Sequence, residues 1–190
     1  MIAGLVLAAG LSRRMGKPKL LLPLDGKALV RWSVEALAPH VDVVVVVTPP
    51  DDRLLRAALE GLDVRFVVNP RPEAGQAASI AVGVGALPPE TGAVVVTLGD
   101  QPRLPAGVVA QVLAAFHREG KPIAAAVFQG TQGTPVVFAA SVFDELRALD
   151  GDAGARAVVR RDPARLTVVA VDAPMPPDVD TPDDYARLLG

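Results

Sequence analysis

Directly after the first apolar run of the sequence, four positively charged side chains lie within seven residues: Arg13, Arg14, Lys17 and Lys19. The 190-residue chain has a net charge of −2, so this positive charge is local. Gly10 and Gly16 can adopt positive φ and expose backbone amides as an anion-binding nest. A triphosphate can neutralise the charge of the four cations and also accept hydrogen bonds from the amides of the nest. A solvated basic loop, or ion pairs with Asp25 and other acids, is the alternative.

The spacing of the glycines argues against two common phosphate-binding loops. A P-loop needs two glycines separated by four residues and then Lys followed by Ser or Thr, whereas five residues separate Gly10 from Gly16 and Pro18 follows Lys17. The dinucleotide pattern G-x-G-x-x-G also fails, because no glycine comes between Gly10 and Gly16. The loop therefore disfavours Walker-type ATPase chemistry, and NAD binding loses its main support.

A carboxylate signal lies further along the chain, in the segment Gly99-Asp100-Gln101-Pro102 after the apolar run Val94–Leu98. An aspartate at the end of a strand can bind Mg²⁺, which prefers one or two carboxylates together with phosphate oxygens and water. The same aspartate could instead cap a turn or a helix. The spacing alone leaves both roles open.

Composition excludes several other kinds of site. The sequence has no cysteine, which rules out disulfides, iron–sulfur clusters, thiolate zinc sites and a cysteine nucleophile. His40 and His117 lie far apart near the ends of predicted helices, so solvated surface roles are favoured over metal binding. The balanced charge and few aromatic residues argue against nucleic acid as the partner.

The longest apolar run, Val41–Val47, is too short to span a membrane, which takes about 20 residues. No secretory signal is recognisable, and we expect a cytoplasmic protein that does not bind membranes.

Apolar runs rich in β-branched residues alternate with segments of helical periodicity. The predicted strands are Ile2–Ala9, Val41–Thr48, Val64–Val68, Ala93–Leu98, Ile123–Phe128, Val136–Phe138 and Leu166–Val171. The predicted helices are Ala28–Ala38, Asp51–Leu59, Gln76–Leu87, Ala106–Glu119, Ser141–Leu149, Ala153–Arg161 and a last helix that begins at Thr181. This alternation is typical of a sheet covered on both faces. We therefore expect one α/β domain over residues 1–190, with three layers and a mostly parallel, Rossmann-like sheet.

Ligands of such sheets bind beyond the carboxyl ends of the strands. The loops Gly10–Pro23 and Gly99–Pro102 each follow a predicted strand, so we expect both at the ligand-binding edge. The polar segment Gln129–Thr134 reads as a loop between two strands. Thr181 offers an N-cap hydroxyl for the last helix, followed by proline and two acids in the first turn.

Several of these segments also match family motifs. "LAAGLSRRMGKPKLLLP" is similar to the signature L-A-A/G-G-x-S-x-R-M-G-x-x-K. "EAGQAASIAVGV", "LGDQP", "GDAGAR" and "DVDTPDDY" are similar, in this order, to a nucleotide loop, a metal-binding loop, an acceptor-side motif and a C-terminal motif. Together they cover nearly the whole chain. In these five motifs the sequence resembles the nucleotidyltransferases with a GT-A-like fold, especially those that attach a nucleotide to the molybdenum cofactor.

The resemblance implies roles for residues in the first two motifs. Lys19 and Arg14 are the implied catalytic residues, because they can stabilise charge on the phosphates during transfer. The implied nucleotide-binding residues are Ala8, Ala9, Gly10, Arg13, Gly75 and Ser79.

The later motifs imply a metal and an acceptor contact. Asp100 is the implied ligand of Mg²⁺, with Asp180 as the second carboxylate, although either Asp178 or Asp180 could merely cap the last helix. Arg156 is the candidate for pairing with a phosphate of the acceptor, and a plain surface position on a helix is its alternative.

The first loop also bears on the nucleotide. Relatives that transfer guanylate usually read L-A-G-G and those that transfer cytidylate read A-A-G, whereas Leu7–Gly10 reads L-A-A-G. The resemblance thus implies a Mg²⁺-dependent enzyme that attaches a nucleotide from CTP to molybdopterin or the molybdenum cofactor and releases pyrophosphate. The alternatives are guanylyl transfer to the same cofactor, cytidylyl transfer to a sugar or methylerythritol phosphate, and a non-catalytic nucleotide- or cofactor-binding chaperone. A molybdoenzyme or cofactor-insertion protein is the implied partner.

Overall fold

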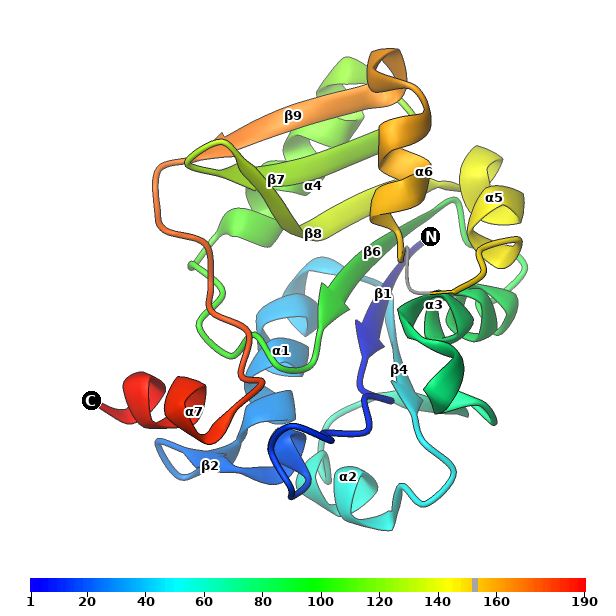
Figure 1. The fold of residues 1–190 in the computed structure, drawn as a ribbon. Helices are drawn as coiled ribbons and strands as arrows, with labels where there is room; N and C mark the ends of the chain where they lie inside the picture. The colour runs from blue at the N-terminus through cyan, green and yellow to red at the C-terminus, as the bar shows by residue number, and fades with distance from the viewer. Residues whose placement is uncertain (152–153) are drawn as a thin grey trace.

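A seven-stranded sheet forms the centre of the protein in the computed structural model, which describes residues 1–151 and 154–190. The strands are β1 (Ile2–Leu7), β4 (Val43–Thr48), β5 (Arg65–Val68), β6 (Ala93–Leu98), β7 (Ile123–Phe128), β8 (Thr131–Ala139) and β9 (Leu166–Val171). Their order across the sheet is β5-β4-β1-β6-β8-β7-β9 (Figure 1). All seven predicted strands are present, and the strand predicted at Val136–Phe138 is longer than its apolar run.

One strand of this sheet, β8, is antiparallel to both of its neighbours, and the other strand pairs are parallel. The reversal comes from a two-residue turn between β7 and β8, in which Gln129 and Gly130 have φ of 47° and 84°. Two successive positive φ angles suit the right-handed twist of a hairpin. The mostly parallel sheet is therefore confirmed. The loop expected over Gln129–Thr134 is only these two residues, because Thr131–Thr134 belong to β8.

Helices cover both faces of the sheet. They are α1 (Leu29–Leu37), α2 (Arg53–Ala58), α3 (Gln76–Gly85), α4 (Val108–Glu119), α5 (Phe143–Arg147), α6 (Arg156–Arg161) and α7 (Pro182–Leu189). Short 3₁₀ turns occupy Lys19–Leu21, Ala38–His40, Pro72–Ala74, Ala140–Val142 and Pro163–Arg165. Residues of α1, α2 and α4 pack in one core cluster and those of α3, α5 and α6 in another, so the three-layer α/β fold is confirmed. The predicted start of the sixth helix, Ala153, lies outside the described residues.

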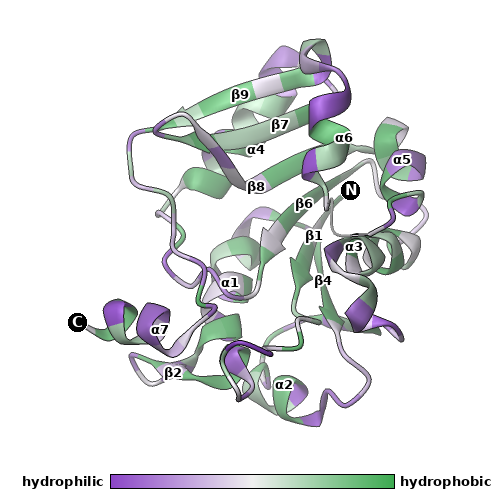
Figure 2. Cartoon of the chain, viewed as in Figure 1, coloured by the Kyte–Doolittle hydropathy of each residue, from purple (hydrophilic) through white to green (hydrophobic). Residues whose placement is uncertain are grey.

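The alternation of side chains along the strands explains the two core clusters. Val44 and Val46 belong to the cluster with α1, whereas Val45 and Val47 belong to the cluster with α3. Successive residues of a strand point to opposite faces, so a continuous valine run serves both layers. Each fully buried valine stabilises the fold by about 1.5–3 kcal/mol. Figure 2 shows β1 and β4 in the green of hydrophobic residues, between helices with mixed surfaces.

A third, smaller cluster lies outside the main sheet, at the strand ends. It contains Met15, Leu22, Leu24, Leu29 and Val179, with Trp32, Tyr185 and Leu188 packed against it. Leu24 belongs to a two-stranded hairpin of β2 (Pro23–Leu24) and β3 (Lys27–Ala28), which the sequence analysis did not predict. This cluster packs α7, at the carboxyl end of the chain, against the segment that follows β1 (Figure 1).

The register of β1 and β6 brings the two candidate loops to one edge. The strands are parallel neighbours in which Leu7 pairs with Leu98, so both end at the same level. Beyond the paired residues, the Gly99 N–H donates to the Leu7 carbonyl at 3.0 Å. A Cβ at Gly99 would lie only 3.1 Å from that carbonyl oxygen, so glycine allows this close approach.

None of the helices that the structure describes combines the length and apolar character that a membrane span needs.

Candidate active site

The loop after β1 folds back on itself before it reaches Lys19. The N–H groups of Met15 and Gly16 both donate to the Ser12 carbonyl, at 3.0 and 3.2 Å. The Ser12 hydroxyl accepts the Lys19 N–H at 3.2 Å. Gly16 has φ of 70°, as predicted. The prediction of a positive φ at Gly10 is wrong, because Gly10 is not among the residues with positive φ. Ser12 has a positive φ instead, of 51°. The turn thus fixes the backbone from which Lys19 extends.

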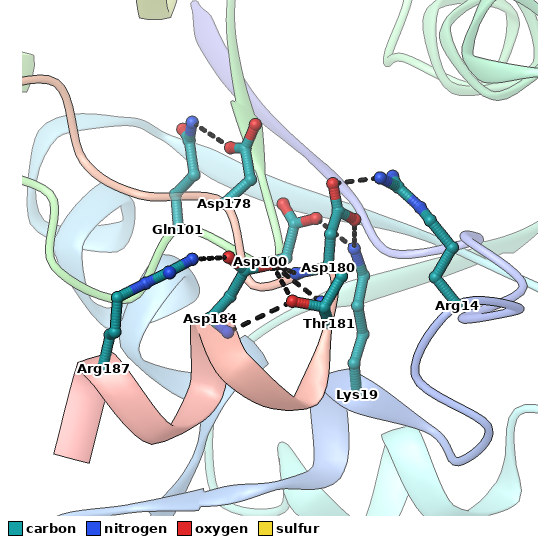
Figure 3. A network of polar contacts seen from close by, with 9 residues as sticks. All are labelled: Arg14, Lys19, Asp100, Gln101, Asp178, Asp180, Thr181, Asp184 and Arg187. Atoms are coloured by element: carbon teal, nitrogen blue, oxygen red, sulfur yellow. Dashed lines mark hydrogen bonds and ion pairs between the residues drawn. The ribbon is translucent and has the colours of Figure 1, made fainter.

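Lys19 lies between two carboxylates that come from distant parts of the sequence. Its Nζ is 2.5 Å from Asp100 Oδ2 and 2.7 Å from Asp180 Oδ1. Only 10% of the Lys19 side chain is exposed, against 17% for Asp100 and 30% for Asp180. Figure 3 shows the ammonium pointing into the space that the two acids border. The predicted meeting of cationic and acidic residues at one edge therefore occurs within hydrogen-bonding distance.

The electrostatics keep this lysine charged. Burial alone opposes the ammonium charge, but the carboxylates of Asp100 and Asp180 outweigh this and raise the pKa of Lys19 above its ordinary value. A buried ammonium is stabilised only by such partners, because its water shell is largely gone. The site is thus built around a positive charge at a fixed position.

The segment before α7 brings Asp180 to this position. The Val179 N–H donates to the Asp100 carbonyl at 3.2 Å, and the Val179 side chain is fully buried. Thr181 caps α7, because its hydroxyl accepts the Asp184 N–H while the Asp184 carboxylate accepts the Thr181 N–H. Asp180 is therefore not the N-cap of the helix, and its carboxylate is directed to Lys19.

Asp178 makes a different contact from Asp180. Gln101 Nε2 donates to Asp178 Oδ1 at 2.6 Å, and the Thr134 hydroxyl donates to Gln101 Oε1. Although the residue as a whole is exposed, partial burial of its carboxylate and the nearby charge of Asp100 raise the pKa of Asp178. The two acids therefore differ in their contacts. Asp180 and Asp100 both contact Lys19, whereas Asp178 connects the loop after β6 to β8 through Gln101.

The other cations of the loop remain more accessible. Arg14 Nη2 is 2.8 Å from Asp180 Oδ2, with 70% of its side chain exposed, so this contact is worth at most about 1 kcal/mol. Lys17 Nζ lies 6.0 Å from the centre of the Tyr185 ring. Asp25 contacts Arg103 at 3.5 Å rather than the basic loop. Among the described acids, only Asp180 forms an ion pair with an arginine of the loop, which leaves the loop able to bind an anion.

A small cavity of about 220 Å³ opens beside Lys19 and Asp100. The predicted residues Ala9, Gly10, Gly75 and Ser79 all line it, together with Gln76. Gly75 has φ of 90° and is the N-cap of α3, so the unpaired amides of the first helical turn lie at the cavity. The Ser79 hydroxyl accepts Asn69 Nδ2 at 3.0 Å, and both residues are buried.

Two predicted nucleotide contacts lie elsewhere. Ala8 does not line this cavity; its N–H donates to the Val47 carbonyl at 2.8 Å, so this amide is already used by the sheet. Ala8 instead borders a more apolar hollow of about 830 Å³ between the loop and α2. Arg13 borders that hollow and also the space of about 210 Å³ next to Lys19 and Asp180.

A further cavity of about 460 Å³ lies against α6. It is lined by Arg156, the predicted acceptor contact, and by Gln101, Asp178 and Thr134. Gln76 and Leu98 line both this cavity and the one beside Lys19. The two cavities therefore adjoin at these two residues.

The sequence of this chain also matches a known protein family. A family model described as the MobA-like NTP transferase domain matches residues 4–166. The chain belongs to this family. It is therefore a MobA-like nucleotidyltransferase, as the sequence motifs indicated.

Named relatives of this MobA-like domain match nearly its full length. The purine catabolism protein PucB of Bacillus subtilis is 32% identical, with 97% of this chain and 94% of that protein aligned. The molybdenum cofactor guanylyltransferase of Rhodobacter capsulatus is 33% identical over 98% of this chain and 94% of its own. A manganese complex of Rv0371c from Mycobacterium tuberculosis superposes with a TM-score of 0.81 and 31% identity, covering 99% of this chain and 97% of that structure.

Some polar residues of the MobA-like site were not singled out from the sequence. Asn69 supports Ser79, and Gln76 lines both cavities. Both lie close to the predicted glycine loop, but nothing in their local spacing marks them. Gln101 was quoted within a motif, yet its bond to Asp178 spans 77 residues. Within residues 1–151 and 154–190, no group of three or more His, Cys, Asp or Glu is arranged to hold a metal.

Proposed function

We propose that the protein transfers a nucleotide from a nucleoside triphosphate to a phosphate of molybdopterin or the molybdenum cofactor, with release of pyrophosphate. The observation that carries this proposal is the Lys19 ammonium, which lies within 2.7 Å of both Asp100 and Asp180 beside the glycine-lined cavity. Family membership supports the reaction type. The relative named as a molybdenum cofactor guanylyltransferase supports the acceptor.

Asp100 and Asp180 fit a divalent metal. Both carboxylates reach one cation from different loops, and two carboxylates completed by phosphate oxygens and water are the ligand set that Mg²⁺ prefers. The manganese complex of the relative from Mycobacterium tuberculosis supports a divalent metal in this fold. A bound Mg²⁺ would polarise the α-phosphate and neutralise part of the triphosphate charge.

The residues of the chain supply the remaining electrostatics. An oxygen of the acceptor phosphate attacks the α-phosphorus in line, the new phosphorus–oxygen bond forms, and the bond from the α-phosphorus to the bridging oxygen of pyrophosphate breaks. Lys19 and Arg14 can leave their bonds to Asp180 and stabilise the charge that grows on the phosphate oxygens. No general base is required, because an ionised phosphate is already nucleophilic.

CTP is the preferred nucleotide in this proposal. Ala9, where guanylyl relatives usually carry glycine, is 3% exposed and lines the 220 Å³ cavity. The extra methyl narrows the cavity and favours a pyrimidine over a purine. GTP is the second candidate, because the guanylyltransferase of Rhodobacter capsulatus matches nearly the whole chain. We expect the product to pass to a molybdoenzyme or a cofactor-insertion protein.

Pyrophosphate release tests the proposal directly. The protein is incubated with Mg²⁺, purified molybdopterin or molybdenum cofactor, and each of the four nucleoside triphosphates in turn. Selective consumption of CTP supports the proposal and selective consumption of GTP supports the guanylyl alternative. Release with none of them would favour a non-catalytic nucleotide-binding protein.

Variants assign the reaction to the site. Asp100→Asn and Lys19→Ala should each lower turnover by about 10²–10³, the usual effect of removing one preorganised electrostatic contact. Asp63→Asn is the matched control, because Asp63 is an exposed acid just before β5 begins, at the opposite edge of the parallel sheet. A variant of Lys19 or Asp100 that turns over like Asp63→Asn would remove that residue from the mechanism.

A further inference from the structure

The arginines on α6 and in the turn that follows it divide into two groups. Arg161 Nη1 is 3.1 Å from Glu145 Oε2, and Arg165 contacts the other oxygen of Glu145 at 2.7 Å. These two guanidiniums lower the pKa of Glu145, and Arg165 has the larger effect, whereas burial opposes it. The carboxyl of Glu145 therefore stays ionised. On this side of the helix, positive charge is compensated.

Among the acids that the structure describes, none compensates Arg156 or Arg160 in this way. Within the described residues, neither side chain has an ion pair or a side-chain hydrogen bond. Both line the 460 Å³ cavity, and they are four residues apart, so they lie on one face of α6. Two like charges at this spacing destabilise a helix unless an anion lies between them.

The packing of α6 fixes this face over the cavity. Val158 and Val159 lie between the two arginines in sequence and are buried in the core under the sheet face, so the helix cannot rotate without exposing them. Gln132 and Thr134 of β8 and Gln101 line the same cavity. A cavity of this volume is large enough for a small ligand, and two exposed arginines line it.

We infer that Arg160, together with Arg156, forms a two-guanidinium clamp for a phosphate dianion on the acceptor. The inference rests on the proposed function and extends it, because the motif resemblance reached only Arg156. Two guanidiniums match the charge of a phosphate monoester and can each donate two parallel hydrogen bonds to its oxygens. Through Gln76 and Leu98, which line both cavities, the clamp adjoins the cavity beside Lys19.

The clamp can be tested without turnover. The metal and triphosphate sites are first saturated with Mg²⁺ and a non-hydrolysable α,β-methylene analogue of CTP, so that added phosphate cannot bind the basic loop. Inorganic phosphate is then titrated by calorimetry and by thermal shift. Phosphate should bind the wild type, and Arg160→Gln and Arg156→Gln should each weaken this binding at least about tenfold. Acetate, a monoanion, should bind more weakly than phosphate.

Arg161→Gln is the matched control, because it removes the neighbouring charge of the same short helix while its wild-type partner is Glu145. It should bind phosphate like the wild type, whatever it does to the melting temperature. In turnover, Arg160→Gln should raise KM for the acceptor and leave KM for CTP unchanged. The clamp is wrong if the wild type binds no phosphate, if Arg160→Gln binds it normally, or if Arg161→Gln weakens it equally.

These outcomes also separate the clamp from the proposed function. If phosphate binding follows the expected pattern but no triphosphate is consumed with the pterin acceptor, the clamp stands and the transfer reaction is wrong. If pyrophosphate is released but phosphate binding ignores Arg160, the reaction stands and the clamp is wrong.

Discussion

The Lys19 side chain occupies the space that a metal shared by Asp100 and Asp180 would also need. Its ammonium is held by both carboxylates, which satisfies two acids that would otherwise repel each other. The same position of the ammonium opposes metal binding, because two positive charges repel each other. Even in water, a unit positive charge about 4 Å from a metal ion costs about 1 kcal/mol for each unit of charge on that ion. In the proposed mechanism, a metal would therefore compete with the lysine for one pair of acids.

This competition predicts opposite effects of one substitution. Lys19→Met keeps the length of the side chain and removes its charge, so we expect Mn²⁺ to bind about tenfold or more tightly in the absence of nucleotide. Turnover should fall over the range given above for Lys19→Ala. Mn²⁺ binding is measured by electron paramagnetic resonance, with Arg118→Gln as the control, because it also removes one positive charge but at an exposed position near the end of α4. Unchanged or weaker Mn²⁺ binding would show that Lys19 does not oppose the metal.

At the scale of elements, the capping box of α7 connects the stability of a helix to the placement of Asp180. The Asp184 carboxylate accepts the Thr181 hydroxyl and N–H, both at 2.7 Å, and the Asp180 N–H at 3.1 Å. These hydrogen bonds, led by those of Thr181, lower the pKa of Asp184 to about 2 from the ordinary 3.8. The helix cap thus orients the residue whose side chain contacts Lys19.

The low pKa of Asp184 predicts a pH-dependent stability. The folded carboxyl is more acidic than the unfolded one, so its contribution is complete above pH 3.8 and is lost as the pH falls through about 2. Asp184→Asn should therefore lower the melting temperature near neutral pH, and this deficit should shrink as the pH falls below about 4. Circular dichroism melts at several pH values measure it. Asp183→Asn, at an exposed position of the same turn, should show no such trend, and a pH-independent deficit for Asp184→Asn would contradict the assignment.

Sequence periodicity predicted the large elements and missed the small ones. Valine runs such as Val43–Val47 identify buried strands because both of their faces are apolar. The first half of β8, Thr131–Thr134, has no large apolar side chain, and its residues 132–134 line the 460 Å³ cavity. The hydropathy pattern therefore predicted too short a strand. The hairpin of β2 and β3 has only two residues per strand, too few for any periodicity. Thr181 was predicted as a cap because its signal is local.

At the scale of the whole molecule, the site depends on contacts between the two ends of the chain. Lys19 is separated from Asp100 by 81 positions and from Asp180 by 161. Parallel strand order predicts that the loops after β1 and β6 meet, since both strands end at one edge. No such rule places Asp180, which follows β9 on the far side of the sheet and reaches Lys19 only because the third cluster holds α7. Its role could be expected only from the motif resemblance.

Removing the last segment of the chain should therefore disrupt the site and leave the sheet folded. The two large core clusters contain none of the described residues beyond Met175, whereas the third cluster needs Val179, Tyr185 and Leu188. A chain that ends at Pro177 should keep the circular dichroism of the sheet and lose nucleotide transfer. It should also lose at least about 1.5 kcal/mol of stability for Val179 alone. The one tryptophan, Trp32, packs against the third cluster, so its fluorescence should shift to the red. Full-length Asp180→Asn is the control, which should lose activity and keep the native emission. Loss of the sheet signal in the shortened chain would instead make α7 part of the folding core.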